Sequence, residues 1–252
     1  MFNESGKMYH IGLSKEDIKG ATFAILPGDP DRVLKIASYF DSYIKLNTVR
    51  EYTSYLCKLN DKNVLVISTG MGGPSTAICV EELNMIGIKN LIRVGTCGGM
   101  QLNVEAGDLI IAQGAIRQEG TSKEYVPVEY PALADISLIN ALLYSCKKNN
   151  YKCHVGVVQS KDSFYGQHDP KRMPSSYELE SKWNAWIKAG CLASEMECAS
   201  LYITASTLKM NACAILLAIW NQERANKNLD NNKYFDNEKE IKAAIDAIRI
   251  LL

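Results

Sequence analysis

The sequence predicts an α/β fold in which helices cover a central, mostly parallel sheet. Short runs rich in Ile, Val, Leu and Ala recur along the chain, and helical patterns lie between several of them. The runs are continuously apolar rather than alternating, which is typical of strands that are covered on both faces. Strands that alternate with helices in this way indicate a layered α/β architecture.

The predicted strands are the six apolar runs, at 21–26, 63–68, 90–95, 108–113, 154–159 and 213–220. The chain has 252 residues, of which 47% are hydrophobic, so it is long enough to bury one large core. Neither a repeat, a low-complexity segment nor a linker divides it. We therefore expect a single domain over residues 1–252.

The predicted helices are marked by apolar spacing and by start and stop residues. The first follows Asp29 as N-cap, with Pro30 in its first position, and the second begins at Pro74 and ends at Gly87. Apolar stripes predict helices over 136–146, over 179–187 and within 194–209.

The C-terminal region is predicted as a long polar loop followed by a helix. The loop covers 221–238, and the helix begins at Asn237. Glu240 follows three residues after Asn237, which is the spacing of a capping box.

Charge and cysteine usage exclude several classes of protein. Lys plus Arg and Asp plus Glu number 28 each, so no global field favours nucleic acid or an anionic membrane. The eight cysteines form no C-x-x-C pair, which predicts reduced, mostly buried thiols. The N-terminal segment 1–17 lacks a basic stretch followed by an apolar one, and no run approaches the length of a membrane span. We expect a soluble, cytoplasmic protein.

Ligands of a parallel α/β sheet bind beyond the carboxyl ends of its strands, so the junctions after the apolar runs are the candidate sites. The first junction reads GDPDR. Gly28 allows a sharp turn, the amides of the helix that begins near Pro30 can face an anion, and Arg32 adds a planar set of donors. Taken alone, this junction is explained as well by an ordinary turn with a surface arginine.

Two further junctions contain glycine-rich segments. STGMGGPSTAI, at 68–78, matches neither the Walker pattern nor G-x-G-x-x-G. IRVGTCGGM, at 92–100, places Arg93 inside an apolar run, where a guanidinium needs a carboxylate or an anionic ligand. Thr96 and the glycines that follow it offer donors to the same anion.

The fourth junction, ASEMECASLY at 193–202, places two carboxylates among small and apolar residues. Glu195 and Glu197 are either internal hydrogen-bond acceptors or groups that hold substrate hydroxyls. The general preference of helix N-termini for acidic residues is the competing explanation.

Together these segments resemble the nucleoside phosphorylase family. The matching pieces are GDPDR, REY at 50–52, STGMGGPS, RVGTCGG, KDSFYGQ and SEMEC, in this order between YHIGLS and AIRILL. The resemblance implies a three-layer α/β fold with a mixed central sheet. It also implies phosphorolysis of a nucleoside, with inorganic phosphate as co-substrate and without an organic cofactor.

The resemblance implies a role for each matching residue. Phosphate is held by Gly28, Arg32, Arg93 and Thr96, and by Arg50 of a neighbouring subunit. The residues implied around the nucleoside are His10 of the neighbour, Thr96, Cys97, Gly98, Phe164, Gln167, His168, Glu195, Met196 and Glu197. Of these, Glu197 and the Met196 backbone hold the ribose hydroxyls, His10 faces the ribose 5′ end, and the amide of Gln167 recognises the base edge.

The resemblance also concerns assembly and a metal. It implies a potassium ion near a dimer interface, held by Glu51, the carbonyl of Met71 and Ser75. It implies a homo-oligomer of dimers, namely a hexamer built as a trimer of dimers.

The expected chemistry needs positioned charges rather than a nucleophilic side chain. Arginines orient the phosphate dianion toward a sugar that gains cationic character, while the base departs with negative charge. Arg93, Glu197 and Gln167 are therefore the candidate catalytic residues.

Uridine is the expected substrate. Purine-specific members of the family place an Asp after the last strand, whereas this chain has Asn221, Gln222 and Glu223 there. The Phe-Tyr-Gly-Gln run resembles the pyrimidine type. Trp220 is either core or a wall that narrows the site against purines. Hydrolytic members need no phosphate arginines, so Arg32 argues against them.

One departure from the family pattern leaves the base-recognising cation open. Members that cleave uridine carry an Arg two positions after the Gln, where this chain has Asp169. The candidate replacements are His168, Lys171, Arg172 and Arg224. The alternative functions are a purine or broad-specificity nucleoside phosphorylase and a non-catalytic nucleoside-binding protein.

Overall fold

The fold is built on one continuous mixed sheet, in a computed structural model that describes residues 6–252. The first five residues of the N-terminal segment considered above lie outside the described residues. The strands are β1 (Phe23–Leu26), β2 (Ser42–Val49), β3 (Tyr52–Leu59), β4 (Lys62–Ile67), β5 (Asn90–Gly99), β6 (Leu109–Gln118), β7 (Ala132–Leu133), β8 (Cys153–Lys161), β9 (Ala193–Glu195) and β10 (Asn211–Asn221).

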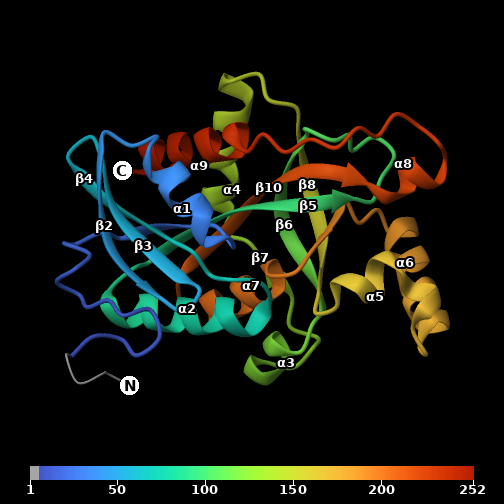
Figure 1. The fold of residues 1–252 in the computed structure, drawn as a ribbon, viewed down its shortest axis with the longest axis horizontal. Coiled ribbons are helices and arrows are strands. Elements are labelled where there is room, and N and C mark those ends of the chain that lie inside the picture. Colours follow the sequence, from blue (N-terminus) through green and yellow to red (C-terminus); the bar gives the residue numbers. More distant parts are fainter. Residues whose placement is uncertain (1–5) are drawn as a thin grey trace.

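Part of the sheet closes on itself. The strand order is β10-β6-β8-β9-β5-β1-β4-β3-β2, and β10 pairs a second time, with β5. Strands β5, β10, β6, β8 and β9 therefore form a closed ring, from which β1, β4, β3 and β2 extend as an open arm (Figure 1). The pairings of β1 with β4 and β5 and of β10 with β5 are parallel. Those of β3 with β2 and β4 and of β10 with β6 are antiparallel.

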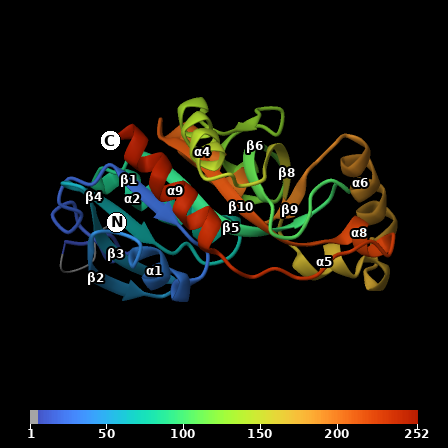
Figure 2. The same ribbon diagram turned by 90° about the horizontal axis from the view of Figure 1, so that it is seen from above.

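Helices cover both faces of the sheet, which gives three layers. The helices are α1 (Pro30–Ala37), α2 (Gly73–Ile86), α3 (Thr121–Tyr125), α4 (Ile136–Lys148), α5 (Phe164–His168), the 3₁₀ turn η1 (Pro170–Arg172), α6 (Ser176–Lys188), α7 (Cys198–Thr207), α8 (Gln222–Asn226) and α9 (Glu238–Leu251). Residues of α1, α4 and α9 form one apolar cluster with the sheet, and residues of α2 and α7 form the other. Figure 2 shows α4 and α9 over the sheet, with α5, α6 and α8 gathered at one end of the molecule.

The predicted α/β class is confirmed, and so are most of its elements. Each of the six apolar runs contains or overlaps a strand: β1, β4, β5, β6, β8 and β10. In α1, Asp29 is the N-cap and its side chain accepts from the amide of Asp31, and α2 ends at Gly87 in the left-handed conformation. The hairpin β2–β3 was not predicted. No residue of β2 is buried, and its sequence has no continuous apolar run. The criterion used to predict the other strands therefore does not detect it.

The predicted capping box of the last helix is wrong. Asn237 is the N-cap of α9, but its side chain makes no capping hydrogen bond. Glu240 is fully buried instead, and within residues 6–252 neither of its carboxylate oxygens has a hydrogen-bond partner. The reason is that α9 packs its first turn inward against the sheet, so Glu240 points into the protein rather than back to the helix start.

The cysteine prediction is confirmed, since all eight thiols are free and all but Cys153 are buried. Within residues 6–252, no helix is long and apolar enough to cross a membrane. The predicted loop 221–238 contains the short helix α8, and its remainder runs back along the molecule toward α9.

Candidate active site

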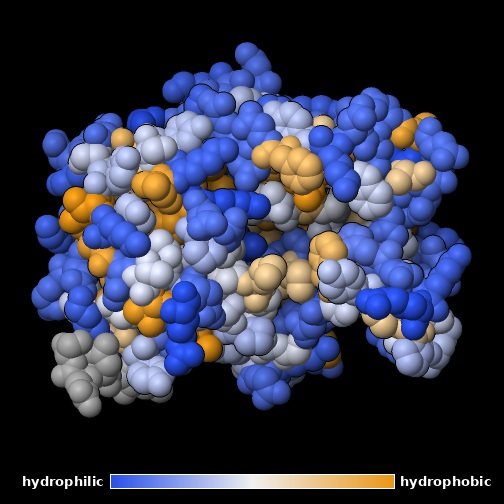
Figure 3. Space-filling model, in the orientation of Figure 1, coloured by the Kyte–Doolittle hydropathy of each residue, from blue (hydrophilic) through white to orange (hydrophobic). Residues whose placement is uncertain are grey.

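A cavity of about 910 Å³ opens at the strand ends, between the open arm and the ring. Its walls come from the β1–α1 turn, the α2 loop, β5, the β8–α5 junction, the β9–α7 junction and β10. Figure 3 shows the face hollowed near its centre, with hydrophilic and hydrophobic surface around the hollow. The predicted residues that line it are Gly28, Arg32, Glu51, Met71, Arg93, Thr96, Cys97, Gly98, Phe164, His168, Glu195, Met196 and Glu197.

One end of the cavity is built for an anion. Gly28 follows β1, and the N-terminal turn of α1 begins beside it with Arg32 facing the cavity. A Cβ atom at Gly28 would lie 3.1 Å from the Gly70 carbonyl and 3.5 Å from Arg93 Nη2. Glycine is therefore what lets this turn approach the guanidinium so closely.

Arg93 and Glu197 form a buried ion pair in the wall. Arg93 Nη2 donates to Glu197 Oε2 at 2.6 Å, and Glu197 Oε1 accepts from the amide of Gly72 at 2.7 Å. Both side chains are about 6% exposed. Arg93 Nε is buried without a hydrogen-bond partner in the described chain. Arg93 also lines the cavity beside Gly28, and a guanidinium is suited to an oxyanion such as phosphate.

Glu195 has a structural role in addition to its place in the wall. One of its oxygens accepts from the amides of Glu197 and Cys198, at 2.8 and 2.9 Å, and the other accepts from the Ser160 hydroxyl. Burial, and then the charge of Glu197, raise the pKa of Glu195. The side chain therefore holds the turn that presents Glu197, and its oxygens are already occupied.

Aromatic rings form the opposite end of the cavity. Phe164 and His168 have ring centroids 4.3 Å apart, and His168 lies 6.5 Å from the Trp220 ring. Burial, and then the charge of Lys161, lower the pKa of His168, which favours its neutral form. Lys161 also lines the cavity, with its Nζ 5.9 Å from the centre of the Phe164 ring.

Gln167 lies behind the cavity wall. Its side chain is buried, and its amide oxygen accepts from Gln159 Nε2 at 3.0 Å. Gln159 Nε2 also donates to Gln118. The amide of Gln167 is thus held in a chain of buried amides next to the aromatic end, and its contact with a base stays a prediction.

Arg50 and His10, which were predicted to act in a neighbouring subunit, lie outside the cavity of their own chain. Arg50 occupies the turn between β2 and β3 with a φ of 53°, and its guanidinium lies 5.9 Å from the Tyr9 ring. His10 donates through its amide to Glu82, and its Nδ1 lies 2.7 Å from Glu82 Oε1. Both residues are on the surface, where a second subunit could receive them.

The oxygen atoms predicted for a potassium ion surround Gly70. Ser75 Oγ donates to the carbonyl of Met71 at 3.2 Å. A Cβ at Gly70 would lie 2.8 Å from Glu51 Cγ and 3.2 Å from Ser75 Oγ, so the set is compact. Carboxylate, carbonyl and hydroxyl oxygens suit a hard cation, but three donors are too few to complete its shell. Potassium binding by these residues stays a prediction.

The residues after β10 are occupied in the scaffold. Asn221 is fully buried, and its Nδ2 donates to the carbonyls of Gln101 and Val104. Its Oδ1 accepts from the amide of Arg224, whose guanidinium donates to the carbonyls of Leu102 and Asp230.

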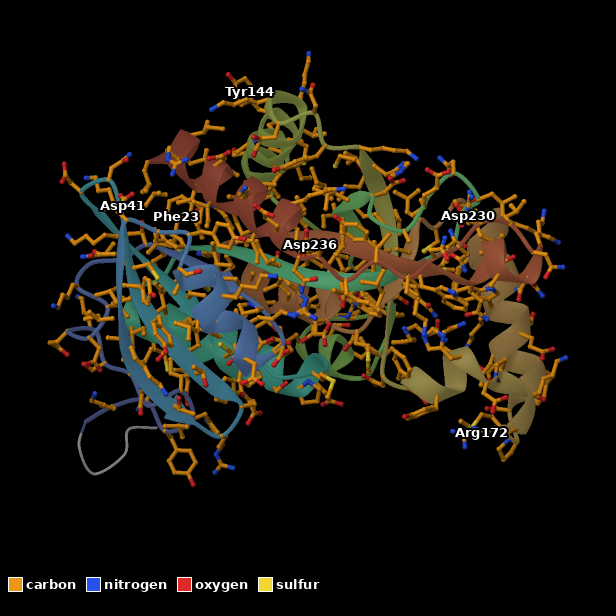
Figure 4. All side chains as sticks on the ribbon, turned by 45° about the horizontal axis from the view of Figure 1, so that its top comes forward. Phe23, Asp41, Tyr144, Arg172, Asp230 and Asp236 are labelled. Carbon is orange, nitrogen blue, oxygen red and sulfur yellow. The ribbon has the colours of Figure 1, made fainter. Side chains whose placement is uncertain are left out.

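Of the four cations proposed for base recognition, only His168 lines the cavity. Arg172 lies on the outer edge of the molecule near α5 and α6 (Figure 4), and Lys171 is exposed beside it.

Sequence reasoning did not name several cavity residues, among them Lys161, Lys233 and Phe235. Lys161 is the last residue of β8, and a charged residue at the end of an apolar strand could have marked it as a candidate site residue. Lys233 and Phe235 come from the 221–238 segment, whose polar composition predicted only a loop. Their position over the cavity follows from the return of the chain to α9, which no local pattern encodes.

The fold and the cavity together define the class of protein. It is an α/β protein with one small-molecule site at the ends of its strands. A glycine turn, an arginine–carboxylate pair and an aromatic wall surround this site. A model of the phosphorylase superfamily matches residues 22–252. The chain belongs to the phosphorylase superfamily.

Individual relatives cover almost the whole chain. A uridine phosphorylase of Treponema pallidum (strain Nichols) is 48% identical over 244 residues, which are 97% of this chain and 94% of that protein. A uridine phosphorylase of Escherichia coli (strain K12) is 37% identical over 97% of this chain and 98% of that protein. A guanosine phosphorylase of Halorubrum lacusprofundi is 35% identical over 97% of this chain and 99% of that protein.

Proposed function

We propose that the protein is a uridine phosphorylase, which converts uridine and phosphate reversibly to uracil and ribose 1-phosphate. The observation that carries the proposal is the Arg93–Glu197 pair, placed between an anion end and an aromatic end of one cavity. The uridine phosphorylases named above support the choice of base.

The phosphate binds at the glycine turn. Gly28 leaves space beside the first turn of α1, and Arg32 and Arg93 supply cationic donors. The Arg93 guanidinium, which lies beside this turn, donates to a phosphate oxygen. Phosphate held in this way is aimed at the anomeric carbon, and its charge stabilises the cationic character that the sugar develops.

The ribose lies over Glu197 and the base lies against Phe164. Because Arg93 and the Gly72 amide fix the carboxylate of Glu197, that carboxylate has a defined orientation toward the ribose hydroxyls. Phe164 and Trp220 provide apolar surface for a flat ring. The Gln167 amide, positioned by Gln159, recognises the base edge.

The site is completed by a neighbouring subunit. His10 and Arg50 lie away from their own cavity, and we propose that they reach the cavity of a second chain in a dimer, three of which form a hexamer. A potassium ion shared by Glu51, Met71 and Ser75 of the two chains stabilises the same interface. We place the protein in the cytoplasm, with a role in pyrimidine salvage.

The decisive experiment measures product release from purified protein with uridine, with and without phosphate. Uracil and ribose 1-phosphate should appear only when phosphate is present. Uracil release that does not depend on phosphate would refute phosphorolysis.

Guanosine is the second candidate substrate, because one relative is a guanosine phosphorylase. The same assay with guanosine, inosine and thymidine tests it. The side chain of Asn221 is occupied by backbone carbonyls, which leaves that position without a proton donor for a purine ring. Preferential turnover of guanosine would nevertheless move the protein to the purine branch.

A further inference from the structure

Lys161 is a buried cation in the cavity wall, and no carboxylate of the described chain is in direct contact with it. It is the last residue of β8, it is 5% exposed, and its Nζ donates to Ser194 Oγ at 2.6 Å. Within residues 6–252, Ser194 is the only hydrogen-bond partner of this ammonium group. An ammonium has three N–H donors, so Lys161 can donate to a ligand as well.

The strand order places Lys161 at the far end of the cavity from the phosphate. From the Gly28 turn after β1, the sheet passes through β5 with Arg93 and β9 with Glu195 before it reaches β8. Neighbouring strands lie about 4.8 Å apart, so Lys161 is roughly 14 Å along the sheet from the β1 turn. Phosphate at one end and ribose over Glu197 leave the base at the Lys161 end.

The nearby carboxylates are already engaged. Glu195 accepts from the Ser160 hydroxyl and from backbone amides, and Glu197 accepts from Arg93 and the Gly72 amide. Burial lowers the pKa of Lys161, while the charges of these two carboxylates oppose that shift. A buried ammonium without a direct counter-ion is costly, and a ligand that carries negative charge would offset the cost.

The other cations considered for base recognition are either neutral or placed elsewhere. His168 is there, but its lowered pKa favours the neutral form. Arg224 is engaged by backbone carbonyls, and Arg172 lies on the outer edge with its Nε 3.4 Å from Asp169 (Figure 4). Lys161 is therefore better placed to meet the base than His168, Arg172 or Arg224.

We propose that Lys161 donates a hydrogen bond to a carbonyl oxygen of the pyrimidine and stabilises the negative charge that the base acquires as it departs. This role rests on the proposed function. A phosphate oxygen forms a bond to the anomeric carbon while the bond between that carbon and N1 of the base breaks. The electron pair of the broken bond passes into the base. Hydrogen phosphate releases one proton in forming the new bond, and the base takes up one proton at N1. Lys161 keeps its own proton throughout.

The test compares two substrates whose bases differ in their need for stabilisation. Fluorine at C5 stabilises the uracil anion, so 5-fluorouridine depends less on a cation than uridine does. Lys161→Met keeps the length of the side chain and removes its charge. We expect kcat/KM for uridine to fall roughly 100-fold, as when one transition-state donor is removed, and kcat/KM for 5-fluorouridine to fall less than tenfold.

The matched control is Lys188→Met, which removes an exposed lysine at the end of α6, outside the cavity. It should leave both values within twofold of the parent protein. Should the methionine variant fail to fold, Lys161→Gln keeps a donor toward Ser194 without the charge, and the same selective loss is expected.

The outcomes separate the two proposals. Equal losses for both substrates, or no loss, would overturn the role of Lys161 while leaving the proposed function standing. If the parent protein releases no uracil from uridine and phosphate, the proposed function fails and the role of Lys161 fails with it.

Discussion

Arg93 Nη2 lies 2.6 Å from Glu197 Oε2, although the two residues are 104 positions apart in the sequence. β5 supplies the arginine, and the turn before α7 supplies the carboxylate. The pair lies between the proposed phosphate end of the cavity and the proposed ribose position. One contact therefore serves both proposed substrate subsites, and it also links β5 to the turn before α7.

Breaking this pair should destabilise the protein as well as abolish turnover. Glu197→Ala leaves the Arg93 guanidinium buried beside an empty space, and losing one partner of a buried pair costs about 3–5 kcal/mol. Chemical denaturation should show this loss, and uridine turnover should fall below detection. Glu178→Ala, at an exposed helix pair, should change the free energy of unfolding by less than about 1 kcal/mol. Equal stability of the two variants would contradict the role of the buried pair.

Gly28→Ala should weaken phosphate binding. The added methyl group meets the Gly70 carbonyl at 3.1 Å and the Arg93 guanidinium at 3.5 Å, so the turn has to move away from its anion-binding position. We expect the KM for phosphate to rise roughly tenfold or more, equivalent to about 1.4 kcal/mol. Gly120→Ala is the control, since its nearest contact would be an ordinary 3.6 Å. An unchanged KM for phosphate in Gly28→Ala would remove this turn from the phosphate site.

Glu240→Gln should stabilise the protein at alkaline pH. Burial raises the pKa of Glu240 from 4.5 to about 7. The charges of Arg32 and Lys35 oppose this rise, and the charge of Asp236, which lies just before α9 (Figure 4), adds to it. A raised pKa means that the folded state holds the proton more tightly, so this contribution to stability is full below about pH 4.5 and is lost as the pH rises through about 7.

Denaturation curves from pH 4 to 8 measure this effect. The parent protein should lose up to roughly 3 kcal/mol relative to Glu240→Gln by pH 8, from about 1.4 kcal/mol for each unit of pKa. The control is Glu238→Gln. Glu238 lies two residues earlier in α9, and its partly exposed side chain pairs with Lys242. Parallel curves for the parent and Glu240→Gln would show that Glu240 does not titrate in this range.

Mixing two inactive variants should restore activity if Arg50 acts in a neighbouring subunit. Arg50→Ala and Arg32→Ala should each be inactive alone. In a mixed dimer, one of the two sites has both arginines, so random exchange should restore about a quarter of the parent activity. Refolding the variants together and assaying uridine turnover measures this. Failure of mixed oligomers to regain activity would place Arg50 outside the neighbour's site.

The predicted phosphate residues Gly28, Arg32, Arg93 and Thr96 all line the cavity, because β1 and β5 are paired in parallel with Leu26 opposite Arg93. Their binding of phosphate stays a prediction. The sequence left open whether Arg93 pairs with a carboxylate or with a ligand. The structure shows that Arg93 pairs with Glu197 and that its buried Nε has no hydrogen-bond partner in the described chain.

The remaining features depend on strand order and on helix rotation. Lys161 becomes a cavity residue only because β8 pairs with β9, and Glu240 turns inward only because α9 packs on the sheet. Neither relation is encoded in local spacing, so local patterns do not distinguish a surface residue from a buried one at these positions.

The closed ring of β5, β10, β6, β8 and β9 also bears on how the protein avoids aggregation. A closed ring offers no unpaired strand edge, so in the described chain β2 and the two-residue β7 are the edges that remain. β2 carries Lys45 and an irregular register beside it, both of which hinder strand addition by another molecule. The half of the sheet that builds the cavity is therefore the half that a foreign strand cannot extend.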